Sequence, residues 1–366
     1  MTVQENYELN IGPQHPSTHG VFRIKVSMNG ETIEDLDMIV GYLHRSMEKL
    51  SEERTYTQNI PFTDRADYLA AMSNNLGYCL AIEKLANVIP PQRATVLRVI
   101  FAELQRIASH AMANGTLVSD AGAWQTPLLY MFREREKILD LFEMTCGARL
   151  TTNYMRIGGV AFEPPAEFYP LLNDLLGELP DKIDEYMDLL STNEIFIART
   201  KNVGIINPKD AINASLSGPA LRGSGVPWDL RKADPYCDYD NYDFDVPLGL
   251  IGDSYDRFMV RMFEVKESVK IIKQALNNLP LGMHKTQIPL ALRPEPGQLY
   301  FRTEGPRGEL GYFVVSDGGP APYRLHIRPP SLINLSLLKQ LAIGSSLPDA
   351  IVTLGSIDIV VGEIDR

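Results

Sequence analysis

The stretch QRATVLRVIFAELQRIASHAMA, residues 92–113, decides the fold class of this chain. Its apolar stripe recurs every three or four positions, at Val96, Val99, Ile100, Leu104 and Ile107. That spacing is the period of an amphipathic α-helix, and Pro90-Pro91 marks a break before it. Similar patterns predict further helices over residues 64–88, 127–146, 166–195 and 252–278, the third of them broken or kinked near Pro180. Long helices that follow one another in this way are typical of a helical bundle core.

Both ends of the chain carry strand patterns instead. Short strands are expected over residues 7–11, 20–28 and 31–40, where an Asn-Gly pair predicts a hairpin turn. Near the other end, residues 299–316 predict a second hairpin, followed by a strand over 323–328 and a short helix near 332–343. We therefore expect an α+β fold in a single domain, 1–366. Its parts are an N-terminal β subdomain (1–60), a helical bundle (61–285) and a C-terminal β-rich segment (286–366).

Charge and hydropathy restrict the possible partners. The net charge of −11 over 366 residues argues against nucleic-acid binding. No stretch approaches the ~18 uninterrupted apolar residues of a membrane span. The first residues, MTVQEN, lack the basic region and apolar core of a signal peptide. We expect any contact with a membrane to be made through partner proteins.

Cysteines are few and far apart in this sequence. Cys79, Cys146 and Cys237 form no C-x-x-C pair, so they predict neither a disulfide framework nor a metal or iron–sulfur site held by this chain alone. Nucleotide-binding and hydrolase motifs are absent as well. Taken alone, these generic patterns indicate only an α+β protein.

The loop GPQHPSTHG, residues 12–20, is the first unusual feature. Its two prolines and two glycines exclude helix and strand and stiffen the chain around His15 and His19. An imidazole that titrates near neutrality can donate a hydrogen bond or a proton to the carbonyl oxygen of a redox ligand. The ordinary alternative is that both histidines satisfy backbone groups in a tight turn.

Three further segments carry candidate groups. Tyr68 follows Asp64-Arg-Ala-Asp at an expected helix start, and a phenol can donate a proton to an oxyanion. Asp120 precedes small residues at a helix end, where a carboxylate caps the helix or orients a histidine. Arg45, beside His44, would raise the potential of a nearby iron–sulfur cluster by its charge. A core tyrosine, a helix cap and a surface salt-bridge network are the ordinary alternatives.

Ten segments, taken in order along nearly the whole chain, resemble the 49 kDa-type subunit family of respiratory complex I. Each segment is weakly specific by itself, but their order is very specific. They are GPQHPSTHG (12–20), GYLHRSMEK (41–49), RTYTQNIP (54–61), FRERE (132–136), GAR (147–149), RIGGV (156–160), LSGP (216–219), WDLRK (228–232), IRPP (327–330) and LGSIDIVVGEIDR (354–366).

The resemblance implies both a fold and a function. The fold would be that of a nickel–iron hydrogenase large subunit without its metal centre. The function would be that of the quinone-binding core subunit of a proton-pumping complex I-type enzyme, an NADH:quinone oxidoreductase. His19 and Tyr68 match the histidine and tyrosine that bond the quinone carbonyls in the family, and Asp120 matches the partner of that histidine. Arg45 matches an arginine near the partner's iron–sulfur cluster, and His15 and His44 are further binding candidates.

Partners are implied by the resemblance in the same way. They are a subunit that carries the terminal [4Fe–4S] cluster, a 30 kDa-type subunit and a membrane-arm subunit at the quinone entrance. NAD would bind only in other subunits, and neither nucleic acid nor a homo-oligomer is required. The protein would lie on the cytoplasmic side of the cell membrane, attached through these subunits.

Two other functions remain open, and two positions depart from the family pattern. An energy-converting membrane-bound hydrogenase would need two C-x-x-C pairs, which the chain lacks. A non-catalytic scaffold of a respiratory complex would be expected to have lost the histidine, tyrosine and aspartate of the site. Many relatives have a histidine where this chain has Thr151. The segment 123–127 is one residue longer than the family pattern, which concerns the geometry around Asp120.

Overall fold

The structure, a computed structural model, describes residues 6–122 and 126–366. The strands are β1 (Asn6–Ile11), β2 (Arg23–Asn29), β3 (Thr32–Ile39), β4 (Met155–Arg156), β5 (Gly159–Val160), β6 (Gly297–Gly305), β7 (Gly308–Ser316) and β8 (Arg324–Arg328). The α-helices of the first half are α1 (Met47–Glu52), α2 (Ile60–Ala66), α3 (Ala71–Ala86), α4 (Gln92–Asp120), α5 (Thr126–Cys146) and α6 (Phe168–Ser191). Those of the second half are α7 (Glu194–Thr200), α8 (Pro208–Asn213), α9 (Gly218–Gly223), α10 (Leu230–Ala233), α11 (Ser254–Asn277), α12 (Pro330–Leu335), α13 (Leu338–Ala342), α14 (Leu347–Ile357) and α15 (Val361–Asp365). Two 3-10 turns are η1 (Pro16–Thr18) and η2 (Tyr239–Asn241).

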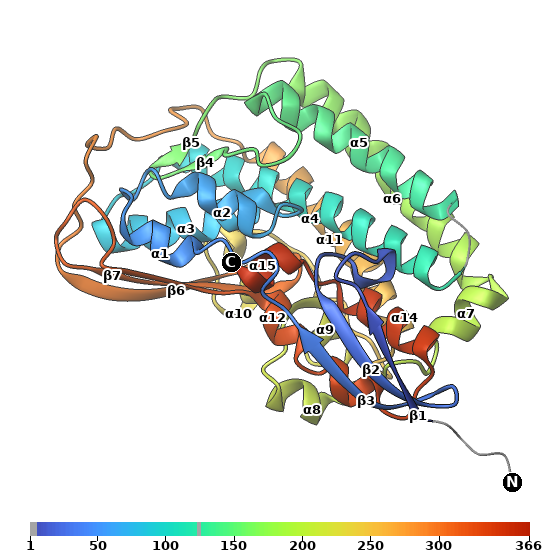
Figure 1. The fold of residues 1–366 in the computed structure, drawn as a ribbon. Helices are drawn as coiled ribbons and strands as arrows, with labels where there is room; N and C mark the ends of the chain where they lie inside the picture. Colours follow the sequence, from blue (N-terminus) through green and yellow to red (C-terminus); the bar gives the residue numbers. More distant parts are fainter. Residues whose placement is uncertain (1–5, 123–125) are drawn as a thin grey trace, which may run out of the picture.

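A helical bundle forms the centre of the molecule, as the apolar periodicity predicts (Figure 1). Helix α4 packs against α3, α5 and α11, and α6 packs against α5 and α11. The apolar stripe of residues 92–113 lies in the main core, since Val99, Ile100 and Leu104 are fully buried. The expected mixed helix-and-strand fold is thereby confirmed.

The two ends of the chain meet in a second apolar core. Strands β1, β2 and β3 form an antiparallel sheet, in which Val26 lies opposite Leu36. Apolar side chains of this sheet pack on those of α13 and α14, including Leu338 of α13 and Leu354 of α14. Figure 1 shows the blue N-terminal strands beside the red C-terminal helices. The structure thus brings residues near position 20 close to residues near position 360.

The C-terminal segment differs from the expectation. The predicted hairpin and third strand are present as the antiparallel sheet β6-β7-β8. The prediction of a single helix near residues 332–343 is wrong, because α12 and α13 are separate helices and α14 and α15 follow them. Most of α14 is buried, and its polar residues Thr353 and Ser356 are buried together with its apolar ones, so they do not mark a solvent-exposed face. Its start is nevertheless capped, since the Asp349 amide donates to the Ser346 hydroxyl at 3.3 Å.

The bounds predicted for the helix over residues 64–88 are also wrong. It is divided into α2 and α3 by a turn over residues 67–70. The Asp67 carboxylate causes this break, because its Oδ1 accepts hydrogen bonds from the amides of Leu69 (3.0 Å) and Ala70 (3.1 Å). Aspartate commonly competes with helical hydrogen bonds in this way.

Pro180 does not break its helix, so of the predicted break or kink the break is wrong. Helix α6 is continuous from Phe168 to Ser191. Buried apolar residues on both sides of the proline, including Leu176 and Ile183, hold the two halves against the bundle. Tertiary packing therefore outweighs the hydrogen bond that the proline removes.

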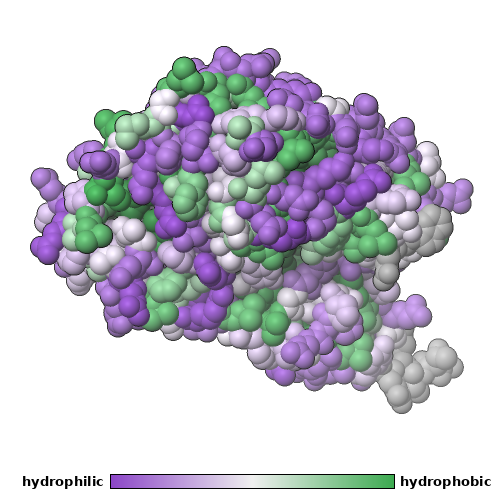
Figure 2. Space-filling view, turned by 90° about the horizontal axis from the view of Figure 1, so that it is seen from above, coloured by the Kyte–Doolittle hydropathy of each residue, from purple (hydrophilic) through white to green (hydrophobic). Residues whose placement is uncertain are grey.

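Among the helices of the described residues, none combines the length and the apolar character that crossing a membrane requires. On the face of the molecule seen in Figure 2, hydrophobic residues occur in small groups among hydrophilic ones.

Candidate functional site

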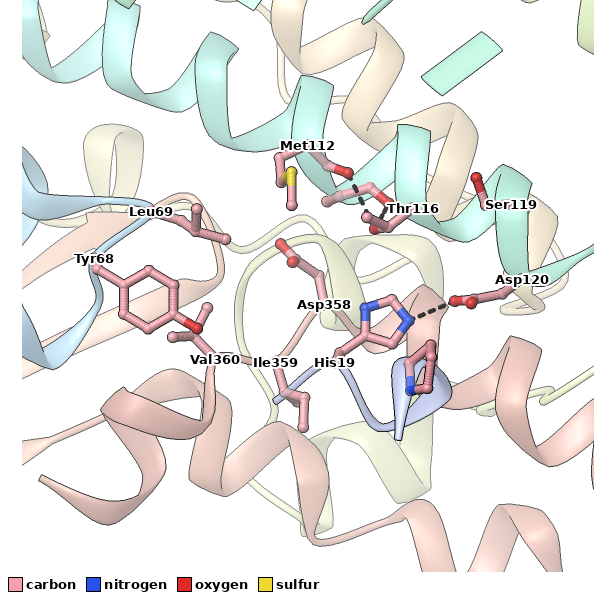
Figure 3. Close-up of a pocket in the computed structure, with 12 residues that line it drawn as sticks. His19, Tyr68, Leu69, Met112, Thr116, Ser119, Asp120, Asp358, Ile359 and Val360 are labelled. Atoms are coloured by element: carbon pink, nitrogen blue, oxygen red, sulfur yellow. Dashed lines mark hydrogen bonds and ion pairs between the residues drawn. The ribbon is translucent and has the colours of Figure 1, made fainter. Parts of the chain in front are cut away.

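A cavity of about 370 Å³ opens where four distant segments meet (Figure 3). The segments are the η1 loop, the α2–α3 turn, the C-terminal half of α4 and the link between α14 and α15. Its lining residues are Pro16, His19, Tyr68, Leu69, Met112, Ala113, Thr116, Ser119, Asp120, Asp358, Ile359 and Val360. Three of the residues predicted from the sequence, His19, Tyr68 and Asp120, are therefore brought together here.

His19 and Asp120 form a hydrogen-bonded pair at one side of the cavity. His19 follows η1 in the left-handed region, with φ 54°, and Asp120 is the last residue of α4. Their Nε2 and Oδ2 atoms are 2.5 Å apart. In Figure 3 the other ring nitrogen of His19 points away from Asp120, toward the side where Asp358 lies.

This pairing changes the protonation of the imidazole. Burial lowers the pKa of His19, but the hydrogen bond and charge of Asp120, together with the charge of Asp358, outweigh burial and raise it. The ring therefore holds a proton to a higher pH than a free histidine would. It is suited to donate a hydrogen bond into the cavity.

Tyr68 lies across the cavity, in the turn between α2 and α3 rather than inside a helix start. In Figure 3 its hydroxyl points toward the side where His19 lies. Burial and then the charge of Asp67 raise the pKa of the Tyr68 phenol, against the opposing effects of Arg307 and Arg45. The phenol is therefore protonated at neutral pH and can act as a donor.

A buried arginine lies behind this wall. Arg307, in the turn between β6 and β7, is 2% exposed. Its Nη1 is 2.5 Å from Oδ2 of Asp67, and its Nη2 is 3.5 Å from Oδ1 of Asp358. One guanidinium thus joins the turn that carries Tyr68 to the link that closes the far side of the cavity.

Two glycines allow the C-terminal helices to approach the site. A Cβ on Gly355 of α14 would lie 2.6 Å from Oδ2 of Asp120 and 3.5 Å from Nε2 of His19. A Cβ on Gly362 of α15 would lie 3.3 Å from the ring of Tyr68. A larger residue at position 355 would press directly on Asp120, and one at position 362 would crowd the Ala66 carbonyl and the ring of Tyr68.

The other predicted residues lie outside the cavity. His15 precedes η1, and its Nδ1 accepts a hydrogen bond from the Ser17 amide. His44 Nδ1 donates to the Asp365 carbonyl at 2.8 Å. Arg45 lies nearer to the site, since its guanidinium donates to the Arg65 carbonyl at 2.7 Å and influences the Tyr68 phenol.

Sequence reasoning missed Asp358, Arg307 and Gly355. Asp358 and Gly355 occur in a C-terminal segment that stood out only by its resemblance to the family. A glycine within an apolar run is a signal of close approach between backbones and could have drawn attention to Gly355. Arg307 carried no comparable signal, because Gly-Pro-Arg-Gly is typical of an ordinary hairpin turn.

We found no group of three His, Cys, Asp or Glu side chains arranged to hold a metal ion within residues 6–122 and 126–366. Cys79, Cys146 and Cys237 are free thiols. The extra residue expected within 123–127 falls on positions 123–125, which lie outside the described residues.

Comparisons with known proteins agree on one family. The family model for the 49 kDa subunit of respiratory-chain NADH dehydrogenase matches residues 120–295 and 286–366. The D subunit of the NADH-quinone oxidoreductase of Dehalococcoides mccartyi strain BAV1 is 54% identical over 362 residues, 99% of each chain. The first D subunit of the same enzyme in Roseiflexus sp. is 50% identical over 379 aligned positions, covering 100% of both chains. Its counterpart in Clostridium beijerinckii is 50% identical over 99% of this chain and 98% of its own.

Proposed function

The chain belongs to the family of the 49 kDa subunit of respiratory-chain NADH dehydrogenase, and we propose that its cavity receives the head group of a quinone. The protein is accordingly a subunit of an NADH-quinone oxidoreductase. One observation carries the proposal about the cavity: two potential proton donors, His19 and Tyr68, face each other across it (Figure 3). A quinone has two carbonyl oxygens, which match these two donors.

The size and lining of the cavity support the same ligand. A volume of about 370 Å³ lies within the ~300–1,000 Å³ that small-molecule sites usually have. Apolar side chains of Leu69, Met112 and Ile359 offer contacts to a flat ring. A few polar groups among apolar walls are what orientation of such a ligand requires.

The proposed reaction takes up two electrons and two protons to convert quinone into quinol. An iron–sulfur cluster of a partner subunit would supply the electrons. As negative charge develops on the carbonyl oxygens, hydrogen bonds from Tyr68 and His19 stabilise it. Imidazolium His19 gives its Nδ1 proton to one oxygen and remains bonded to Asp120 through Nε2, while Tyr68 gives its phenol proton to the other.

The chain's own charges fit these proton transfers. Asp120 stabilises the imidazolium form of His19 before transfer, and it can orient the ring as the proton is replaced. Arg45 and Arg307 both favour the tyrosinate that Tyr68 becomes. Protons taken up from solvent then restore both groups.

Assembly and fold are further parts of the proposal. The family assignment supports a partner that carries the terminal [4Fe–4S] cluster, a 30 kDa-type subunit and a membrane-arm subunit at the quinone entrance. It also supports attachment to the cytoplasmic side of the membrane through these subunits. We propose a hydrogenase-like fold on the ground of the family resemblance, and we propose that it holds no metal because the chain lacks the two C-x-x-C pairs of those enzymes.

Replacing the two donors in the assembled enzyme tests the proposal and distinguishes it from a non-catalytic scaffold. We expect Tyr68→Phe and His19→Ala each to reduce quinone reduction by about 100-fold, since a lost hydrogen bond to a developing oxyanion costs ~3 kcal/mol. The measurement is kcat/KM for a short-chain quinone, normalised to NADH oxidation by an artificial acceptor that bypasses the quinone.

Tyr323→Phe is the matched control. Its ring is 68% exposed and lies outside the cavity, so removal of its hydroxyl should leave quinone reduction unchanged. Wild-type kinetics for both Tyr68→Phe and His19→Ala would remove the cavity from the reaction and leave the scaffold function in its place.

A further inference from the structure

Arg307 occupies a position that lies outside the cavity and yet connects two of its walls. It contacts Asp67, whose other oxygen fixes the turn that bears Tyr68. It also faces Asp358, which lines the cavity beside His19. Resting on the function proposed above, we propose that Arg307 is a positioning residue of the quinone site, a fixed positive charge that holds these two carboxylates and thereby the two proton donors in place.

The backbone around Arg307 is firmly held. Its carbonyl accepts a hydrogen bond from the Asn334 side chain at 3.0 Å. The neighbouring Gly308 packs so closely on Ser217 that a Cβ there would overlap the Ser217 hydroxyl. A guanidinium on such an anchored turn can restrain a neighbouring segment, such as the short turn between α2 and α3.

The contacts of Arg307 indicate that its positive charge matters more than the number of its hydrogen bonds. Within the described residues, Nε and Nη2 of Arg307 have no hydrogen-bond partner, although both are buried. The contact between Nη2 and Asp358, at 3.5 Å, is therefore electrostatic rather than a hydrogen bond. Arg307 is therefore a buried arginine with two nitrogen atoms unpaired among the described residues, and its charge lies beside the carboxylates of Asp67 and Asp358.

Several charges surround this arrangement and decide its pH dependence. Burial raises the pKa of Asp67, Arg307 opposes that rise, and Asp358 adds to it. Burial and then Asp67 raise the pKa of Glu363 on α15 to about 8, so this carboxyl is protonated at neutral pH. Among the described residues, Arg261 of α11 and Tyr68 also face Arg307, and His19 faces Asp358.

Removing the positive charge has a predictable sign. Without the guanidinium, the pKa of Asp67 rises further, and the carboxylate takes up a proton nearer to neutral pH. Its acceptor bonds to the Tyr68 turn weaken as it does so. Activity that depends on the ionised form is then lost as the pH falls through the raised value.

Two variants of the assembled enzyme separate charge from packing. Arg307→Gln keeps a hydrogen-bond donor but removes the charge, whereas Arg307→Lys keeps the charge. We expect Arg307→Gln to shift the acid limb of kcat/KM for a short-chain quinone upward by about 1–3 pH units, the size of effect that a neighbouring charge has. We expect Arg307→Lys to keep the wild-type pH profile.

Arg302→Gln is the control, since Arg302 lies on β6 of the same hairpin, outside the cavity, and contacts Asp234 at 3.2 Å. It should behave as wild type. An unshifted profile for Arg307→Gln would overturn the inference. So would a shifted profile for Arg307→Lys, which also serves as the test if the glutamine variant does not assemble.

If Tyr68→Phe is defective while both Arg307 variants are normal, only this inference fails. If Tyr68→Phe and His19→Ala are normal, the proposed function fails first.

Discussion

At the scale of single residues, the His19–Asp120 pair has the clearest consequence. Burial alone would lower the pKa of the imidazole, so the raised pKa depends on neighbouring carboxylates. In the reaction proposed here, the charged form of His19 transfers a proton to a quinone oxygen. That proposal makes the reaction depend on Asp120, a residue that does not itself need to touch the substrate.

Asp120→Asn tests this dependence. Without the carboxylate, burial dominates and the pKa of His19 falls below its usual value of 6.5. Each unit of decrease leaves about tenfold less imidazolium at a given higher pH. We expect quinone reduction by the variant to fall, relative to wild type, as the pH rises from 6 to 8. Asp245→Asn, at a side chain that is 89% exposed, should show no such trend.

The same pair affects stability with a defined sign. Because folding raises the pKa of His19, its stabilising contribution is fully present below the ordinary pKa and is lost as the pH rises through the raised one. Asp120→Asn should therefore lose most stability at acidic pH. A thermal inactivation series showing a larger loss at pH 8 than at pH 6 would contradict this assignment of charge.

The residue scale also shows what the sequence could predict about the site. His19, Tyr68 and Asp120 could be predicted because their side chains suit proton transfer and their motifs match one family, and they line one cavity. Asp358 and Arg307 could not, because an isolated charged residue in a loop looks the same whether it is buried or exposed. Only the tertiary structure reveals that Arg307 is enclosed between two carboxylates.

At the scale of elements, the approach of α14 to α4 completes the site. Gly355 is the point of contact, since its missing side chain leaves room for the carboxylate of Asp120. The periodicity of residues 92–113 predicted most of α4, but the helix continues to Asp120 and so delivers this carboxylate to the cavity. Helix α14 was not predicted, because the periodicity of a short, mostly apolar run does not distinguish a buried helix from a buried strand.

Gly355→Ala tests this contact between helices. Alanine favours a helix by ~1 kcal/mol over glycine, so α14 itself should tolerate the change. The new methyl group would lie 2.6 Å from Asp120 Oδ2, so this oxygen must shift, and the same oxygen makes the bond to His19. We expect a loss of quinone reduction in an assembled enzyme, with the same trend against pH as in Asp120→Asn.

The chain offers a matched control for that substitution. Gly177 lies inside α6, and a Cβ at this position would have no neighbour within 4 Å. Gly177→Ala should therefore keep full activity and stabilise its helix slightly. Normal activity in Gly355→Ala as well would mean that the contact between α14 and α4 is not needed.

At the scale of the whole molecule, the site depends on how the chain ends are joined. The sequence predicted strands at both ends and a bundle between them, but not that the N-terminal sheet packs on the C-terminal helices. Such contacts between distant segments leave no local pattern in either segment. They form a second apolar core that includes Phe22, Leu36 and Leu354, and the loop bearing His19 leads directly into this core.

Leu36→Ala is the test of that second core. Leu36 lies on β3 and is 2% exposed, so its truncation should cost about 2–5 kcal/mol through lost burial and the cavity left behind. The loss should be local, because the main core of the bundle is a separate cluster of side chains. We expect hydrogen exchange of the assembled enzyme to show weaker protection in β2, β3 and α14 while α4 keeps its protection. Quinone reduction should then be lost at a lower temperature than NADH oxidation by an artificial acceptor.

Ile89→Ala, at a side chain that is 83% exposed, should change neither measurement. Equal loss of protection in α4 and α14 would show that the molecule has one cooperative core, in which case the His19 loop could not be loosened separately from the bundle.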